Sequence, residues 1–452
     1  MCSFPIVEGP EIMRKISVWI VGTALFLLSS YPSYYLAEEK TLQQLIDETP
    51  SNGTLLLQGK TYRGNVVIAK PITIKGSDKT HIKGDGTGNV ILIKEPGHGV
   101  TLENLKISHG SLSRNSLEEY SAVKVLSDRN VLRDLIISDS FHGIYLSGSH
   151  ENNISGVHVT GVGEGEIGGQ GNGIQLIRSH RNRLSDSEIK NSRDGIYFYY
   201  AHDNQVENTK VTHTRYGLHY MYSDNNRFYK NNFSLNTGGA AIMQSKGIEL
   251  IANEFSYHQG TRAFGLMIQA SNDNKIKDNR FFYNQRGIYL DLSQHNHIIS
   301  NDFNQNRIGV ELWASSSNQT FSLNRFNNNT IPVITIGGQS NNEWSMDRKG
   351  NQWGSSIPLL DLNRDRIGDI PVQYKSSLAK LIEDQELVYL FLQSPAILIY
   401  EKINQFLHKQ EIVFEDPYPL MGNRQKSIGM TWVLLIPFIF IIRAYLERRR
   451  AR

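Results

Sequence analysis

The chain has 452 residues, 39% of them hydrophobic, and a formal net charge of +3. This length can bury one large core or two ordinary ones, and the single cysteine, Cys2, excludes an intrachain disulfide. The last ten residues, RAYLERRRAR, carry +4 by themselves, so the rest of the chain is near −1 and lacks the basic field that nucleic-acid binding requires.

The N-terminal segment has the features of an export signal. From Met13, the sequence MRKISVWIVGTALFLLSS places two basic residues before an apolar run from Ile16 to Leu28. Residues 1–37 are therefore predicted to be a signal peptide, cleaved after Ala37, or an uncleaved N-terminal anchor. Either alternative predicts that the body of the protein lies outside the cytoplasm.

Residues 38–345 contain a repeat whose usual length is 22 residues. Glycines that precede an apolar alternation recur at Gly143, Gly173, Gly195, Gly217, Gly239, Gly265, Gly287 and Gly309. Nine residues after all of these except Gly239 stands an asparagine: Asn152, Asn182, Asn204, Asn226, Asn274, Asn296 and Asn318.

A unit of this length with two or three short strands is typical of one coil of a parallel β-helix, whose stacked asparagines form a ladder at the bends. Leucine-rich repeats have another leucine and asparagine spacing, and propeller blades are about twice as long. We therefore predict an all-β, right-handed parallel β-helix solenoid, which begins with a capping helix and first coil in LQQLIDETPSNGTLLLQGKTYRG.

Side-chain alternation divides the strand that follows each glycine. Positions one and three are apolar and must face the inside of the coil, as in Ile196/Phe198 and Leu218/Tyr220. Positions two and four face out, and they read Tyr145/Ser147, Gln175/Ile177, Tyr197/Tyr199, His219/Met221, Ala241/Met243, Met267/Gln269, Tyr289/Asp291 and Glu311/Trp313. The middle of this outer face is thus rich in Tyr, His, Met and Trp.

Four of these outward residues are candidate metal ligands. Met221 and Met243 hold the same position on adjacent coils, and His219 shares a face with Met221. Met267 lies one coil beyond Met243, at the neighbouring position. Thioether and imidazole groups suit Cu(I). The pattern alone also allows a protein-docking surface or simple packing beneath a loop.

A carbohydrate-active site is a further alternative, because aromatic outer grooves occur in extracytoplasmic β-helices that process polysaccharides. Asp291 and Glu311 face out on adjacent coils, about 8 Å apart by strand geometry. This separation suits an inverting pair of carboxylates. However, the outer face has no cluster of several carboxylates with Lys or Arg.

Two segments follow the repeats. Residues 346–423 are predicted to be irregular and helical, with two helices in SLAKLIEDQELVYLFLQSPAILIYEKINQFL that are broken before Pro395. Residues 427–446 are predicted to form a transmembrane helix, because the uncharged run SIGMTWVLLIPFIFII precedes a basic tail. The basic tail predicts a cytoplasmic C-terminus.

Several segments, in this order, resemble the NosD family: GNGIQL, RDGIYFYY, RYGLHYMYS, GGAAIMQS, EWSMDRKGNQWGS, DLNRDRIGDIPV, LQSPAILIYE and DPYPLMGN. The resemblance covers roughly residues 40–423, and the motifs outside the repeats make it specific. NosD proteins are extracytoplasmic β-helix proteins of nitrous oxide reductase maturation. They work with an ABC transporter, formed by the ATPase NosF and the permease NosY, and with the copper lipoprotein NosL.

The resemblance implies a non-enzymatic accessory protein. It would receive or position copper, or a sulfur precursor, outside the cytoplasm for the copper–sulfide centre of nitrous oxide reductase. His219, Met221 and Met243 lie within the matching motifs, whereas Met267 lies outside them. The competing function is that of a polysaccharide-active hydrolase, lyase or epimerase.

The chain departs from the family pattern at two places. Near Asp361 the family has a calcium-like loop, but Arg366 occupies the place of its glycine, so we expect a structural turn rather than calcium binding. The C-terminal anchor is the second departure, and we expect it to replace or reinforce docking to the permease.

Overall fold

The computed structural model describes residues 40–114, 118–163, 165–339, 341–354 and 359–422. The chain divides into two compact units, Met1–Thr41 and Leu42–Arg452. The predicted export signal and the predicted anchor at 427–446 both lie outside the described residues. Among the residues that are described, no helix combines the length and apolar character needed to cross a bilayer.

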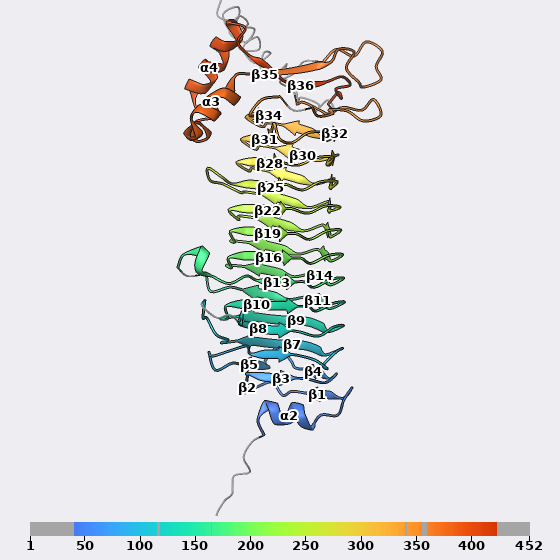
Figure 1. Cartoon of the computed structure of the whole chain (residues 1–452), viewed down its shortest axis with the longest axis vertical. Helices are drawn as coiled ribbons and strands as arrows, with labels where there is room; N and C mark the ends of the chain where they lie inside the picture. Colours follow the sequence, from blue (N-terminus) through green and yellow to red (C-terminus); the bar gives the residue numbers. More distant parts are fainter. Residues whose placement is uncertain (1–39, 115–117, 164, 340, 355–358, 423–452) are drawn as a thin grey trace, which may run out of the picture. The chain divides into compact units, whose positions relative to one another are not determined.

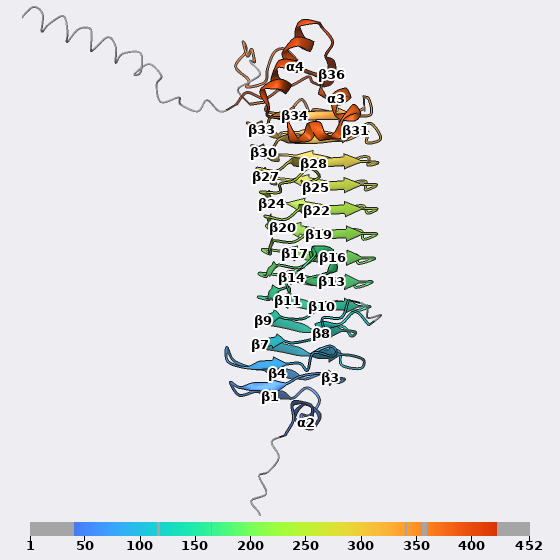
Figure 2. The ribbon, with the colours of Figure 1, turned by 90° about the vertical axis from the view of Figure 1, so that its left-hand side faces the viewer.

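From Leu42 onward the chain winds into a parallel β-solenoid (Figures 1 and 2). One side is a sheet of twelve parallel strands, one from each coil. These strands are β3 (Val66–Ile68), β6 (Ile91–Ile93), β8 (Ser121–Val125), β10 (His142–Ser147), β13 (Ile174–Ile177), β16 (Asp194–Tyr199), β19 (Tyr216–Met221), β22 (Gly238–Met243), β25 (Phe264–Gln269), β28 (Arg286–Asp291), β31 (Ile308–Trp313) and β34 (Ile331–Ile336). The predicted parallel solenoid is thus confirmed, while its right-handed winding stays a prediction.

The remaining 22 solenoid strands form a second sheet with two ladders, which join in the long strands β7 (Thr101–Ser108) and β9 (Val131–Ser138). The first ladder also contains β1 (Thr54–Leu56), β4 (Thr73–Lys75), β11 (Asn153–Ser155), β14 (Arg183–Ser185), β17 (Gln205–Glu207), β20 (Arg227–Tyr229), β23 (Glu249–Ile251), β26 (Lys275–Lys277), β29 (His297–Ile299) and β32 (Thr320–Ser322). The second contains β2 (Thr61–Arg63), β5 (His81–Lys83), β12 (His158–Thr160), β15 (Glu188–Lys190), β18 (Lys210–Thr212), β21 (Asn232–Ser234), β24 (Glu254–Ser256), β27 (Arg280–Phe282), β30 (Asp302–Asn304) and β33 (Arg325–Asn327). A short 3-10 helix, η1 (Ile167–Gly169), interrupts the loop before β13.

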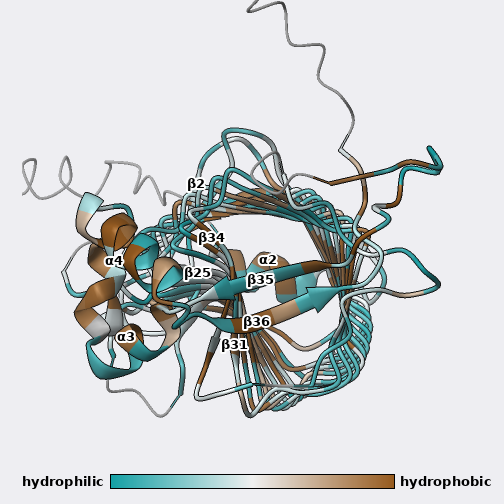
Figure 3. Ribbon diagram, turned by 90° about the horizontal axis from the view of Figure 1, so that it is seen from above, coloured by the Kyte–Doolittle hydropathy of each residue, from teal (hydrophilic) through white to brown (hydrophobic). Residues whose placement is uncertain are grey.

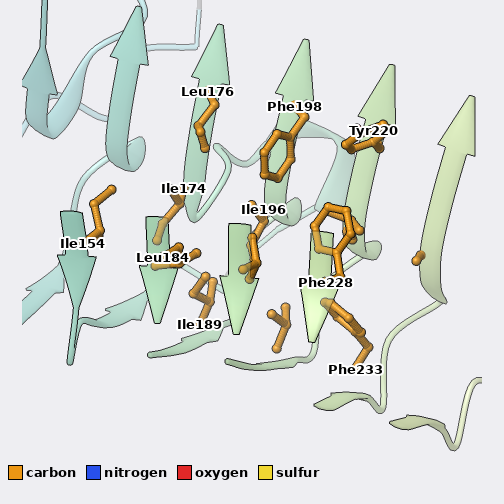
Figure 4. Close-up of a cluster of buried hydrophobic side chains, with 14 of the residues drawn as sticks. Ile154, Ile174, Leu176, Leu184, Ile189, Ile196, Phe198, Tyr220, Phe228 and Phe233 are labelled. Atoms are coloured by element: carbon orange, nitrogen blue, oxygen red, sulfur yellow. The ribbon is translucent and has the colours of Figure 1, made fainter. Parts of the chain in front are cut away.

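The core is the inside of the coils, and it contains the side chains that the alternation placed there. Ile196, Leu218 and Leu266 are fully buried and lie in one column of the twelve-stranded sheet. Figure 4 shows Ile174, Ile196, Phe198 and Tyr220 pointing inward toward the opposite strands. A stack of Phe233, Phe255, Phe281, Phe303 and Phe326 runs along the same core, with ring centroids 4.7–5.4 Å apart.

Asparagine ladders bind successive coils together at the bends. Asn182 Nδ2, for example, donates to Asn204 Oδ1 at 3.0 Å, and the Asn182 N–H donates to the same oxygen at 2.8 Å. The prediction for Asn318 is wrong, because the ladder continues from Asn296 to Gln319 (3.1 Å). That coil has 23 residues, one more than the usual repeat, which shifts the ladder position by one.

Both ends of the solenoid are covered. At the first coil, helix α2 (Leu42–Glu48) buries Leu42 and Ile46, and Gln43 bonds both the N–H and the carbonyl of Val67. At the last coil, a two-stranded antiparallel sheet, the cap sheet of β35 (Val372–Ser376) and β36 (Glu411–Asp416), places Phe414 against Trp344 and Trp353. Covered ends cannot pair with strands of other molecules.

Three short helices lie against the outer face of the last coils: α3 (Leu378–Asp384), η2 (Glu386–Leu390) and α4 (Pro395–Phe406). They share an apolar cluster with β31 and β34 that includes Ile308, Ile334, Leu378, Tyr389 and Ile397. The break before Pro395 is present as predicted, with Pro395 in the first turn of α4. The cap sheet was not predicted.

Candidate metal centre

The outer strip consists of the outward-facing residues of β16, β19, β22 and β25: Asp194, Tyr197, Tyr199, Tyr216, His219, Met221, Ala241, Met243, Phe264, Met267 and Gln269. Leu218 and Tyr220 of β19 are fully buried in the core, so His219 and Met221 project from the opposite face. Met221 and Met243 are register partners on adjacent strands, which lie about 4.8 Å apart. Both thioethers are half-buried.

The thioether pair lies within a polar and aromatic column of the same sheet. Tyr199 pairs with Met221 on one side, and Gln269 pairs with Met243 on the other. Tyr199 also contacts Tyr200 and Tyr222 edge-on, with ring centroids 4.7 and 5.9 Å away. These rings lie next to the Met221 side of the methionine pair.

His219 lies on the outer face but is only 9% exposed, so the expectation that it points freely into water is wrong. Its Nδ1 lies 2.8 Å from Oδ2 of Asp194. The rings of Tyr197 and Tyr216 meet the imidazole edge-on, with centroids 4.9 and 5.4 Å away. Arg215 completes the cluster by donating to both carboxylate oxygens of Asp194, at 2.8 and 2.6 Å.

Asp194 determines which nitrogen of His219 is available. Its side chain is 1% exposed, and this burial would raise the pKa of the carboxyl, but hydrogen bonds from His219 and Arg215 outweigh burial and lower that pKa. An ionised carboxylate only accepts hydrogen bonds, so Nδ1 of His219 carries the proton. In the neutral ring the lone pair is then on Nε2, as in metal-binding histidines that are oriented by a carboxylate.

Asp194 was missed because the alternation breaks at the repeat glycine. Counting every second residue back from Ile196 past Gly195 would place Asp194 on the inside. Gly195 itself faces the core, since an added Cβ would lie 2.2 Å from Cγ1 of Val211. Two successive positions therefore face inward, and Asp194 returns to the outer face. The signal in the sequence that could have indicated this outward position is a charged residue directly before a repeat glycine.

Met267 is separated from the other candidates. It pairs with Ala241, which pairs in turn with His219, so two strand spacings, about 10 Å, lie between Met267 and His219. The structure thus brings His219, Met221 and Met243 to neighbouring positions and leaves Met267 at the edge of the group.

The donors present fit a soft, monovalent cation. Two thioethers in register and one imidazole nitrogen with a fixed lone pair are ligands that Cu(I) accepts, and flexible methionine side chains can converge on one ion. Within the described ranges, no group of three or more His, Cys, Asp or Glu side chains is arranged to hold a metal ion. A site here would therefore depend on methionine sulfur.

The predicted carboxylate pair is not an open acid–base site. Glu311 is 1% exposed, since Arg286 bonds it at 2.6 Å and the ring of Tyr389, from η2, lies over Arg286 at 4.4 Å. Asp291 accepts hydrogen bonds from Gln269 and Ser315. The expectation that Glu311 faces water is therefore wrong, because the C-terminal helices cover that end of the sheet.

The loop at Asp361 closes on itself. Asp361 accepts from the N–H of Arg366 at 3.1 Å, Asp365 from that of Ile367 at 2.8 Å, and Asp369 from that of Leu362 at 2.6 Å. The carboxylates thus stabilise a turn, while the expectation that this loop does not bind calcium stays a prediction.

These features define a parallel β-helix protein with soft metal donors on the outer face of one sheet. Residues 161–356, which include the whole outer strip, match the family model of NosD, described as a periplasmic copper-binding protein. The match is consistent with a NosD-family protein and confirms the resemblance carried by the repeat motifs. No curated protein sequence matches the chain.

Solved structures with a similar fold include polysaccharide-active enzymes. The A-module of the Azotobacter vinelandii mannuronan C-5 epimerase AlgE6 superposes with a TM-score of 0.54 at 10% identity, over 68% of this chain and 92% of that chain. A double mutant of the periplasmic alginate epimerase AlgG gives 0.47 at 14% identity, over 71% and 84% of the two chains. At 10% identity, the likeness to the AlgE6 module shows the β-helix fold alone.

Proposed function

We propose that this protein is a non-enzymatic accessory factor that holds or positions copper, or a sulfur precursor, outside the cytoplasm during assembly of the copper–sulfide centre of nitrous oxide reductase. The family match supports this role, because the description of that family names copper and the periplasm. The observation that carries the proposal is the register pairing of Met221 with Met243 beside a histidine oriented by Asp194.

The partners in this proposal follow from the resemblance. An ABC transporter formed by NosF and NosY, the lipoprotein NosL and nitrous oxide reductase would meet the protein at the membrane surface. The apolar segment 427–446 would anchor the C-terminus in the cytoplasmic membrane. Copper would be cargo on the outer strip, accessible from one side because Met221 and Met243 are only half-buried.

An anaerobic competition titration of the full chain against a Cu(I) chelator tests the ligand assignment. Met221→Ala with Met243→Ala, and separately His219→Ala, should weaken Cu(I) binding by about tenfold or more, which corresponds to about 1.4 kcal/mol per decade. The matched control is Met346→Ala, which removes an exposed methionine outside the strip. Unchanged affinity in both strip variants would reject the metal assignment.

A polysaccharide-active enzyme is the second candidate, and the cluster of Asp194, Arg215 and His219 beside Tyr197 is the observation that favours it. Two features weigh against it. Burial raises the pKa of Tyr197, which makes its hydroxyl harder to use as a catalytic base, and Glu311 is held by Arg286. Turnover of a glycan panel that disappears in His219→Ala or Asp291→Asn would favour the enzyme. A passive scaffold would show neither copper binding nor turnover.

A further inference from the structure

Helix α4 is oriented with its apolar side away from the protein. The less exposed positions Ile397, Tyr400, Glu401 and Asn404 follow helical spacing and form the face toward the body. The outward face consists of two rows at four-residue spacing, Leu398–Lys402–Phe406 and Ile399–Ile403–Leu407, which line one depression. The inward face of α4 is therefore more polar than its outward face, which reverses the usual arrangement of a surface helix.

Polar contacts fix this orientation. Glu401, on the inward face, accepts hydrogen bonds from the Ser377 N–H at 2.9 Å and from Gln410 Nε2 at 2.8 Å. Ser394 caps the helix by accepting from the Ile397 N–H at 3.4 Å. Turning the apolar rows toward the body would leave Glu401 without these donors. The exposed rows are thus built into the structure rather than left over from poor packing.

The α4 face, defined as Leu398, Ile399, Ile403, Phe406 and Leu407, is large and strongly apolar. Phe406 is 84% exposed and the other four are 49–60% exposed. Figure 3 shows α4 as a largely hydrophobic helix at the side of the solenoid, outside the ring of strands. Contiguous apolar surface of this kind marks a contact with another apolar phase or molecule.

The sequence that follows α4 indicates that the apolar phase in contact with this face is a lipid bilayer. The described structure ends at Gly422, and the uncharged run SIGMTWVLLIPFIFII begins five residues later, at Ser427. A segment that spans the bilayer would hold this section of the protein next to the lipid. The uncharged run has 16 residues, and a bilayer span needs about 20. If this run spans the bilayer, the whole of it is needed for the span, and no part of it remains to cover α4.

We propose that the α4 face lies in the interfacial layer of the lipid bilayer. Its aliphatic and phenyl groups would enter the boundary between headgroups and acyl chains, and Lys402, in the row between Leu398 and Phe406, would extend its ammonium group to lipid phosphates. The anchor and the α4 face then form two membrane contacts, and together they set the orientation of the solenoid on the membrane. The proposal requires neither copper nor any particular partner.

Site-directed spin labelling of the full chain tests this contact. Cys2→Ser removes the single native cysteine, and Phe406→Cys or, in a second protein, Ile399→Cys introduces the label. The protein is reconstituted into vesicles of phosphatidylcholine and phosphatidylglycerol, and the accessibility of the label to oxygen and to a water-soluble nickel chelate is measured. Lys275→Cys, on an exposed solenoid position, is the reference.

A label on the α4 face should be several-fold more accessible to oxygen than to the nickel chelate, relative to the reference label. High accessibility to the chelate would show a water-exposed face and overturn the proposal. Protection from both reagents would show that protein covers the face, either residues 427–446 or a second copy, and would also overturn it.

A matched pair of variants separates the apolar contact from the anchor alone. With the label at Leu398→Cys, the changes Ile403→Asp and Phe406→Asp should abolish the preference for oxygen while the chain stays in the vesicles. Ile136→Asp, at an exposed position on β9 comparable to Ile403, should leave the preference intact. A preference that survives in the first variant would contradict a role for the α4 face.

Discussion

At the scale of residues, the central feature is the link from Arg215 through Asp194 to His219. Asp194 bridges the guanidinium of Arg215, just before β19, and the imidazole of His219 in β19. Asp194 and His219 are buried, and Arg215 is half-buried. Since an ionised carboxylate fixes the proton on Nδ1, the same contact directs the lone pair of Nε2 away from the cluster. Asp194 is thus a positioning residue, which acts on a bound ion only through His219.

Asp194→Asn should therefore weaken Cu(I) binding without removing a ligand. Outer-shell changes of this kind typically cost about 10–100-fold in metal affinity. Chelator competition at several pH values, together with circular dichroism to monitor the fold, measures the effect. Asp203→Asn, at a turn outside the strip, is the control. Wild-type affinity in a folded Asp194→Asn protein would show that Asp194 has only a structural role.

At the scale of elements, one asparagine ladder includes a titratable residue that is fully buried, His258. His258 replaces asparagine in the ladder that runs through Asn236 and Asn284: Asn236 lies 3.3 Å from its Nδ1, and its own N–H donates to Asn284. Burial lowers the pKa of His258 from 6.5 to about 4, against the raising effect of hydrogen bonds with the carbonyls of Asn236 and Phe233.

This shift makes the stability of the solenoid fall in acid. The unfolded chain takes up a proton near pH 6.5 and the folded chain only near pH 4, so the contribution of His258 is fully present above pH 6.5 and is lost as the pH falls toward 4. The expected loss is about 2 kcal/mol by pH 5. His258→Asn restores the ladder and should flatten the pH dependence of urea midpoints between pH 7.5 and 5. Parallel losses in both proteins would refute this assignment.

The asparagine ladders themselves should contribute strongly to stability. Asn279 is buried, donates to Leu250 O and Asn301 Oδ1, and accepts from the Asn253 N–H. Asn279→Ala leaves these buried groups unpaired and should lower the free energy of unfolding by about 2–4 kcal/mol. Asn318→Gly is the control, because Asn318 lies outside the ladder at a left-handed φ of 57° that suits glycine. Equal urea midpoints for the two variants would contradict the ladder account.

The repeat period predicts the sheets, the inward residues and most of the ladder, because strand alternation and coil length are local properties of the sequence. It fails where local counting fails: at Gly195, which interrupts the alternation, and at Gln319, where a coil gains one residue. The burial of Glu311 also escaped prediction, because it depends on Arg286 and on Tyr389 from a helix outside the repeats.

At the scale of the whole molecule, the unit from Leu42 onward is a solenoid. Helix α2 covers its first coil, the sheet of β35 and β36 covers its last coil, and the C-terminal helices leave the outer strip uncovered. The cap sheet depends on Phe414, which stacks on Trp344, Trp353 and Tyr374 at centroid distances of 4.5, 4.2 and 5.5 Å. The C-terminal helices then cover the outer face of the last coils only. The strip of β16 to β25 stays available for cargo or for a partner protein.

Removing the cap residue should destabilise the whole solenoid. Phe414→Ala should cost about 3–5 kcal/mol, as other buried aromatic truncations do, and should expose the last coil to edge pairing. Thermal unfolding and size-exclusion chromatography measure both effects. Phe406→Ala removes an exposed phenyl group and should change stability by less than about 0.5 kcal/mol. A monomeric, fully stable Phe414→Ala protein would show that the sheet of β35 and β36 does not act as a cap.

X-ray absorption spectroscopy of the full chain loaded with one equivalent of Cu(I) tests the metal centre most directly, because it reports which atoms touch the ion. Two sulfur neighbours and one nitrogen neighbour are expected, with the sulfur contribution lost in Met221→Ala with Met243→Ala and kept in Met346→Ala. A sulfur contribution that persists in the double variant, or a copper environment of oxygen and nitrogen alone, would contradict a centre built on this pair of methionines.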